Sequence, residues 1–208
     1  MSPHENTRSA FSLLEMLVVI AIIAILMGLG VPAFVSIGRG SGARGATDLA
    51  SSISLSARIE AMTFGYGSLL VIENGTNVTR KLQRMWVLRY TNTPDPTAIE
   101  KNTELVGKAV ALPKETFFLP EYSTPTNTAS LTNLPGLAST PVFYYKFLGT
   151  GQLESTLETR LVFSANVMDS TGNLQNPAAL IQGRRGFLLR KNGRPALFLT
   201  PDQMGKNP

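Results

Sequence analysis

The sequence contains no cysteine and a single histidine, His4. The lack of cysteine excludes disulfide bonds and metal sites with cysteine ligands. A lone histidine near the start of the chain leaves the rest without histidine-dependent catalysis. The sequence also has no glycine-rich phosphate loop ending in Lys-Ser or Lys-Thr, and no close cluster of carboxylates for a hard cation. We therefore expect no enzyme, no catalytic residue, no metal and no cofactor.

Charge is missing from one long stretch, because no charged residue occurs between Met16 and Gly38. A helix of roughly 20 apolar residues spans the hydrocarbon core of a bilayer. One carboxylate, Glu15, stands at the front of this run. An acidic side chain inside a membrane helix costs on the order of 3 kcal/mol at the centre, so it indicates a function. The stretch predicts a membrane helix in which Glu15 has a specific role.

The start of this stretch resembles the N-terminus of type IV pilins and type II secretion pseudopilins. The residues that carry the resemblance are Ala10-Phe11-Ser-Leu-Leu-Glu15 after a short polar leader. The resemblance implies cleavage by prepilin peptidase between Ala10 and Phe11, and N-methylation of the new terminus. It also implies that Glu15 pairs with the terminus of a neighbouring subunit, and that Pro32 kinks the helix. Most members have glycine where this chain has Ala10, but alanine is small enough to be tolerated.

The resemblance also implies a location and a set of partners. The leader would stay in the cytoplasm, which Arg8 favours, and the helix would cross the bacterial inner membrane once. The C-terminal domain would then be periplasmic until the subunit joins a pilus or pseudopilus with other subunits. A conventional secretory signal cleaved near Gly30-Val-Pro-Ala33 is the alternative for this stretch.

Beyond the apolar run, a second helix is predicted from Ala46 onward. Its expected buried face consists of Ala46, Leu49, Ala50, Ile53, Ala57 and Ala61, and Leu55, Ile59 and Met62 are expected to widen that face. Glycines between Gly38 and Gly45 weaken a helix, so this region is either a flexible juncture or a weak turn of one long helix. The pattern Ala57-Arg58-Ile-Glu60-Ala61 is similar to H-type minor pseudopilins. Pilin-like proteins of Planctomycetes and Verrucomicrobia-type bacteria share the wider resemblance.

The remainder of the chain reads as β-structure. Alternating and apolar runs predict strands at Ser68–Glu73, Gln83–Tyr90, Val106–Leu112, Thr116–Leu119, Val142–Phe147 and Thr159–Phe163. Residues 120–141 are rich in Ser, Thr, Asn and Pro and predict a long loop. Asn192-Gly193, between two apolar runs within residues 186–200, predicts a hairpin.

These elements predict an α+β, pilin-like fold. It has a long N-terminal transmembrane helix and a C-terminal antiparallel sheet. The expected divisions are a leader at residues 1–10, a transmembrane and assembly helix at 11–37, a second helical half at 38–64, and a periplasmic β-rich domain at 65–208.

The net charge of +5 lies entirely in the last segment. From Gln182 onward, six basic residues face one acidic residue, and the thirteen basic and thirteen acidic residues elsewhere cancel. The basic residues around the hairpin are Arg184, Arg185, Arg190, Lys191 and Arg194. Such a strip can attract the phosphates of DNA, with affinity that falls as salt rises. A solvated hairpin face, or contact with anionic lipid or with an acidic neighbouring subunit, is the simpler explanation of these charges.

The sequence as a whole favours a structural subunit, of the minor kind, in a type IV pilus or a type II secretion pseudopilus. Two alternatives stay open. One is a DNA-binding minor pilin of a natural-transformation system, and the other is a simple membrane-anchored periplasmic domain.

Overall fold

The computed structural model describes residues 13–77, 79–95, 99, 101–124, 127–131, 140–155, 159–175 and 183–197, and the side chains of residues 26–40 lie outside this description. The chain divides into two compact units, Met1–Gly38 and Arg39–Pro208. The predicted leader, together with Ala10 and Phe11, lies outside the described residues.

The first unit contains the beginning of helix α1 (Leu13–Phe64). Its side chains from residue 13 to residue 25 are exposed, and most of them are Leu, Ile, Val or Met. Among the residues whose side chains are described, no helix is long and apolar enough to cross a membrane. The predicted transmembrane segment 11–37 extends over residues outside this description and stays a prediction.

Helix α1 is α-helical throughout, including the glycine-rich stretch from Gly38 to Gly45 and the position of Pro32. Of the two alternatives for the glycines, one continuous helix is therefore the structure. The bend expected at Pro32 stays a prediction.

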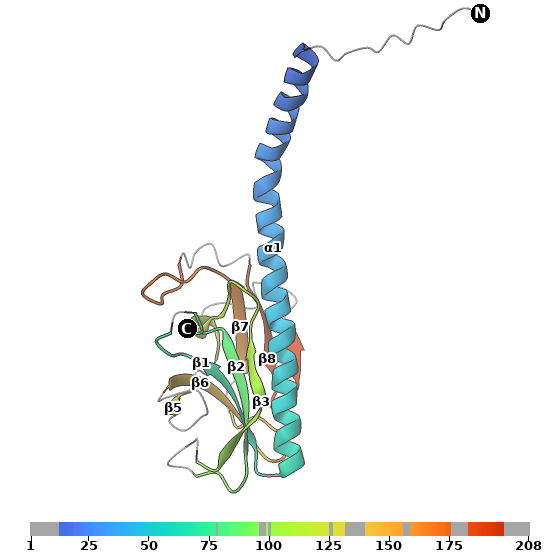
Figure 1. Cartoon of the computed structure of the whole chain (residues 1–208). Coiled ribbons are helices and arrows are strands. Elements are labelled where there is room, and N and C mark those ends of the chain that lie inside the picture. The colour runs from blue at the N-terminus through green and yellow to red at the C-terminus, as the bar shows by residue number, and fades with distance from the viewer. Residues whose placement is uncertain are drawn as a thin grey trace, which may run out of the picture. The chain divides into compact units, whose positions relative to one another are not determined.

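In the second unit, α1 packs its small residues against two sheets (Figure 1). Ala46, Ala50, Ala57 and Ala61 are fully buried, and Ile53 is 8% exposed. Alanine lets the helix backbone approach a sheet closely, and the 3–4 spacing keeps these residues on one face. The helix ends at Phe64 and is followed by Gly65, whose φ of 76° suits glycine and whose amide donates to the carbonyl oxygen of Ala61 at 3.0 Å.

The predicted width of this buried face was wrong. Leu55, Ile59 and Met62 are 40%, 53% and 49% exposed. At 3.6 residues per turn, these positions lie on the side of the helix opposite Ala50, Ile53 and Ala57. Apolar character made them look like core residues, but their angular position places them on the solvent side.

The larger sheet is antiparallel and has the strand order β3-β2-β1-β6-β5. Its strands are β1 (Ser68–Glu73), β2 (Arg84–Tyr90), β3 (Thr103–Ala111), β5 (Asn127–Leu131) and β6 (Thr140–Phe147). The central strand β1 is buried along its whole length. Leu70 and Ile72 face the helix, while Leu69 and Val71 belong to a second apolar cluster with Trp86 and Leu88.

The smaller sheet is also antiparallel, with the order β4-β7-β8-β9. It contains β4 (Thr116–Phe118), β7 (Thr159–Ala165), β8 (Arg185–Leu189) and β9 (Pro195–Leu197), and a short 3-10 helix η1 (Pro120–Tyr122) follows β4. Phe118, Phe163 and Phe187 form a chain of ring contacts in the core. The α+β class and the hairpin at Asn192-Gly193 are thereby confirmed, with Gly193 at φ 74°.

The prediction of one long loop over residues 120–141 was wrong in part. This stretch contains η1, the edge strand β5, and the first residues of β6. Strand β5 pairs with β6 from Asn127↔Tyr144 to Leu131↔Thr140, and Leu131 is 1% exposed. Burial of one leucine and pairing with a neighbour outweigh the loop-like composition of the segment.

Strand β3, at one end of the described sheet order, carries a bulge. Its pairing with β2 shifts register between Met85 and Val87, opposite a glycine, Gly107, at φ 70°. A β-bulge inserts an extra residue, bends the strand and increases its twist. The strand begins three residues before the predicted Val106–Leu112 and ends at Ala111.

Candidate functional site

Three regions of the described chain are candidates for function: the first turns of α1, the tip of the β8–β9 hairpin, and a pocket beside η1. In the part of the chain that the structure describes, no group of three or more His, Asp or Glu side chains is placed to hold a metal. Each region is described separately below.

Glu15 lies in the first turn of α1 and is exposed. A carboxylate there interacts favourably with the positive end of the helix dipole. Its surroundings are apolar, and Leu13 and Leu14 are 84% and 74% exposed. The first turns of α1 thus place one acidic group on an otherwise apolar helix surface. Pro32 lies in the same helix, at a position whose side chain is not described.

The basic residues of the C-terminal segment fall into two groups that β8 separates. Arg184 and Arg185 stand at the start of the strand, while Arg190, Lys191 and Arg194 surround the turn at its other end. A strand of five residues is about 17 Å long. The five side chains therefore do not form one continuous strip.

Arg184 is also not a surface residue. It is 6% exposed, and its guanidinium carbon lies 3.6 Å from the centroid of the Tyr122 ring. The neighbouring Arg185 is half-buried and donates to the carbonyl oxygen of Arg184 at 2.8 Å. A stacked guanidinium in a water-poor position is a packing element as well as a charge. The expectation that Arg184 contributes to an exposed basic strip is corrected by its burial.

The exposed cations of the tip are Arg190, Lys191 and Arg194. The turn is closed by hydrogen bonds from Arg190 N to Arg194 O (3.1 Å) and from Gly193 N to Arg190 O (2.7 Å). Arg58 of α1 fixes the tip, because its Nε donates to the carbonyl oxygen of Asn192 at 2.9 Å. The described structure thus holds three cations together at one end of the hairpin.

Glu60, on the same turn of α1, makes a separate contact with the larger sheet. Arg89 of β2 pairs with Glu60 at 3.4 Å and with Glu104 of β3, and its guanidinium carbon lies 3.9 Å from the centroid of the Phe64 ring. Arg58 and Glu60 thus both connect the helix to the β-structure.

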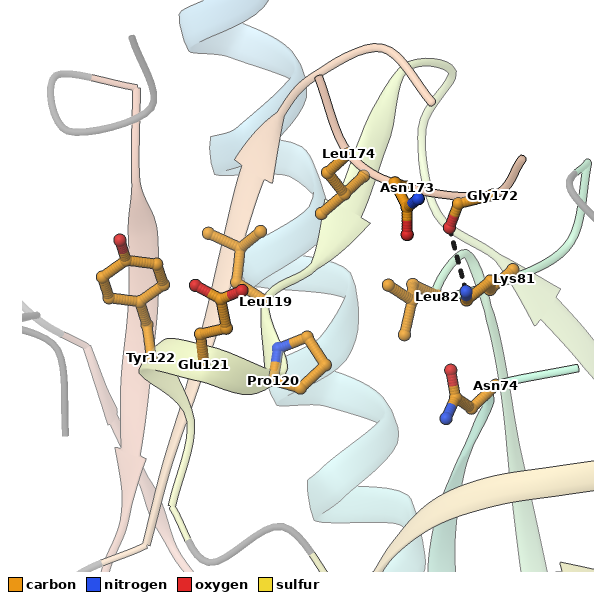
Figure 2. Close-up of a pocket in the computed structure, with 10 residues that line it drawn as sticks. All are labelled: Asn74, Lys81, Leu82, Leu119, Pro120, Glu121, Tyr122, Gly172, Asn173 and Leu174. Carbon is orange, nitrogen blue, oxygen red and sulfur yellow. Dashed lines mark hydrogen bonds between the residues drawn. The ribbon is translucent and has the colours of Figure 1, made fainter. Parts of the chain in front are cut away.

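A pocket of about 370 Å³ opens beside η1 and was not predicted from the sequence (Figure 2). Its apolar lining consists of Leu82, Leu119, Pro120, the Tyr122 ring and Leu174, and its polar lining includes Asn74, Lys81, Glu121 and Asn173. Lys81 Nζ donates to the carbonyl oxygen of Gly172 at 2.9 Å, which closes one side. The lining residues come from three separate segments of the chain, so no local sequence motif predicts the pocket.

The comparison with protein-family models matches residues 6–31 to the prokaryotic N-terminal methylation motif. The matched segment includes the predicted cleavage position, Phe11 and Glu15. The chain therefore carries an N-terminal methylation motif, which is consistent with type IV pilins and pseudopilins. The curated proteins and the solved structures contain no match to this chain. The similarity to H-type minor pseudopilins stays a prediction.

Proposed function

We propose that the chain is a structural, minor subunit of a type IV pilus or a type II secretion pseudopilus. The observation that carries this proposal is the methylation motif at residues 6–31, with Glu15 inside it. Prepilin peptidase would cleave between Ala10 and Phe11 and methylate the new amino terminus. The length of 208 residues favours a minor subunit over the bulk one.

The apolar surface of α1 explains why such a subunit assembles. Side chains of residues 13–25 are exposed and mostly apolar, so they need lipid or other helices around them. Before assembly, the N-terminal helix would cross the bacterial inner membrane once, with the β-domain in the periplasm. After extraction from lipid, the same surface would be buried against the helices of other subunits.

Glu15 then acts as a pairing group. An unpaired carboxylate buried among apolar helices is much more costly than a paired one. The methylated amine of Phe11 in a neighbouring subunit would supply the opposite charge. The pairing would fix how far one helix is shifted along the next.

Intact-mass and N-terminal analysis of the protein from its native membrane tests the proposal. We expect a chain that begins at Phe11 and is about 14 Da heavier than the unmodified chain. A chain that begins at Met1 would support the simple membrane-anchored domain instead. A chain that begins near Phe34 would indicate a conventional secretory signal and would remove any role for Glu15.

Replacement of the carboxylate tests the pairing. Glu15→Leu should still insert into the membrane, because it removes a polar group from an apolar helix. It should enter filaments or the tip complex at least about tenfold less than wild type, which corresponds to loss of about 1.4 kcal/mol. The measurement is the amount of subunit in sheared or purified filaments relative to the membrane fraction. Met16→Leu is the matched control, and normal incorporation of Glu15→Leu would contradict the pairing.

The exposed tip of the β8–β9 hairpin supports a second candidate function, DNA binding by a minor pilin. Arg190, Lys191 and Arg194 lie close together and are exposed, which suits contact with phosphates rather than with bases. Binding to a labelled 30-base-pair duplex should weaken steeply as salt rises. Replacing all three cations with alanine should abolish the binding. Equal binding by wild type and the triple variant would exclude this function for the tip.

A further inference from the structure

A short apolar stripe on the solvent side of α1 has no part in the proposed function. It consists of Leu55, Ile59 and Met62, spaced by four and three residues and about half exposed. Residues at these spacings lie on one face of a helix. The stripe therefore forms a narrow apolar ridge on the side of α1 opposite its buried alanine face.

The hairpin tip lies directly beside this stripe. Arg58, on the same side of α1 as Met62, holds the tip through Asn192. A Cβ atom added to Gly151 would lie 2.7 Å from Met62 Sδ, and one added to Gly193 would lie 2.9 Å from Arg58 Cδ. The hairpin tip and the neighbouring turn at Gly151 are therefore packed closely against this part of the helix. The ridge and the tip are thus parts of one surface.

This surface is apolar in its middle and cationic at its border. Arg190, Lys191 and Arg194 supply the positive charge. One acidic residue, Glu154, lies near the tip, because the amide of the preceding Leu153 donates to the carbonyl oxygen of Lys191. Glu154 forms an ion pair with Lys146 at 2.6 Å. An apolar centre with a charged border is the usual anatomy of a protein–protein interface.

We propose that this surface docks a different protein chain, one that presents an apolar ridge flanked by acidic side chains. The same surface on a second copy is a poor match, because both copies would present the exposed cations Arg190, Lys191 and Arg194 to each other. A nucleic acid would use the cations but not the aliphatic ridge, which offers no aromatic platform for bases. Charge complementarity therefore selects an acidic and apolar partner, and the contact would place this subunit beside another component of its assembly.

Site-specific photo-crosslinking in the native cells tests the docking. The full chain carries p-benzoylphenylalanine at Ile59, and the crosslinked peptide is sequenced by mass spectrometry. We expect a different chain whose crosslinked segment contains Asp or Glu among apolar residues. The yield should fall at least about fivefold when Arg190→Glu and Lys191→Glu are combined, since each reversed charge then repels the partner. Raising the salt concentration should lower the yield in the same direction.

Two controls keep the result specific. The crosslinker at Lys108, an exposed residue of β3, should not give the same product. The combined Lys108→Glu and Lys114→Glu variant, which reverses two exposed charges elsewhere, should leave the yield at Ile59 unchanged. Crosslinking only to a second copy, to lipid or to nothing would overturn the docking proposal. Normal N-terminal processing in the same cells would show that the proposed function is unaffected by that failure.

Discussion

Tyr145 is a fully buried tyrosine in the middle of β6, surrounded by the apolar cluster that joins α1 to the sheets. Its hydroxyl oxygen has no hydrogen-bond partner within the described chain. Burial raises the pKa of the Tyr145 hydroxyl, so the group stays neutral. A hydroxyl of this kind loses its bonds to water on folding and regains none.

We predict that Tyr145→Phe leaves the free energy of unfolding unchanged or raises it by up to about 1 kcal/mol. Urea unfolding followed by fluorescence of Trp86 measures this. Tyr90→Phe is the matched control, because the Tyr90 hydroxyl donates to the carbonyl oxygen of Ile99 at 3.0 Å. The free energy of unfolding of Tyr90→Phe should be about 1 kcal/mol lower than that of wild type. A larger loss for Tyr145→Phe than for Tyr90→Phe would contradict the prediction.

Glu73 is the buried acid at the end of β1. It is 3% exposed, and one of its carboxylate oxygens, Oε2, has no partner among the described residues. Burial raises the pKa of Glu73, and the positive charges of Arg84 and Arg80 oppose this with smaller effects. A raised pKa means that the folded chain binds this proton more tightly than the unfolded chain. Its contribution to stability is therefore full below the unfolded pKa and is lost as pH rises through the folded pKa.

The consequence is a pH-dependent difference between wild type and Glu73→Gln. The urea midpoints of the two proteins should be most similar near pH 4. As pH rises toward 7, the midpoint of the variant should increase relative to that of wild type. Urea midpoints at several pH values measure the difference. Glu115→Gln, at an exposed position, should not show this trend. A constant difference across the range would show that Glu73 does not titrate as stated.

Arg184 shows what could not be predicted from sequence at the scale of one residue. Its position in a basic run suggested a surface strip, because charged side chains are usually exposed. The ring that covers it, Tyr122, is 62 positions away in η1. Only the fold brings the two together. Arg190, at the other end of β8, is exposed as expected.

At the scale of the element, apolar runs with clear ends were predicted best. The segments Ser68–Glu73, Thr159–Phe163 and the Asn192-Gly193 hairpin carry apolar side chains between strong turn signals, and all are found. Strand β5 (Asn-Thr-Ala-Ser-Leu) was missed because its composition favours a loop and its stability comes from pairing with β6. The predicted burial of Leu55, Ile59 and Met62 was wrong, because the prediction gave their apolar character more weight than their angular position on the helix.

The docking of the hairpin on α1 depends on Gly193. A Cβ atom at this residue would lie 2.2 Å from the carbonyl oxygen of Gly151. Gly107 has nearly the same backbone conformation, φ 70° against 74°, but nothing lies within 4 Å of its Cβ position. A side chain at Gly107 would therefore meet only backbone strain, whereas a side chain at Gly193 would meet backbone strain and a steric clash.

We predict that Gly107→Ala lowers the free energy of unfolding by about 1 kcal/mol, because alanine is unfavourable in a left-handed backbone conformation. Gly193→Ala should cost at least about 2 kcal/mol more, because the hairpin must also move away from Gly151 and Arg58. Urea unfolding of both variants gives the comparison. Equal costs would indicate that the tip is not packed against the helix as described.

At the scale of the molecule, the division at Gly38 and Arg39 separates two kinds of helix surface. From Ala43 onward, α1 has one face buried against the sheets, whereas the side chains of residues 13–25 are exposed all round. The general plan of an N-terminal helix and a C-terminal β-domain could be predicted because this contrast is visible in the sequence. The pocket beside η1 could not, because it requires the relative positions of three loops.

We predict that residues 39–208 fold without the N-terminal segment, since both sheets and the helical face that covers them lie in this unit. Circular dichroism should show one cooperative thermal transition, and gel filtration should show a soluble species. Within this fragment, Ile53→Asp should prevent folding, because Ile53 is buried, while Leu55→Asp should be tolerated. An aggregated fragment, or equal effects of the two substitutions, would contradict the independence of this unit.

The bulge in β3 has a consequence for copies of this chain at high concentration. An outermost strand offers unpaired amides and carbonyls, and identical molecules held close to one another can join such edges into a continuous sheet. The bend at Gly107 interrupts the regular spacing that a second strand would need along β3. We therefore expect this irregularity to hinder amyloid-like pairing of two copies along β3.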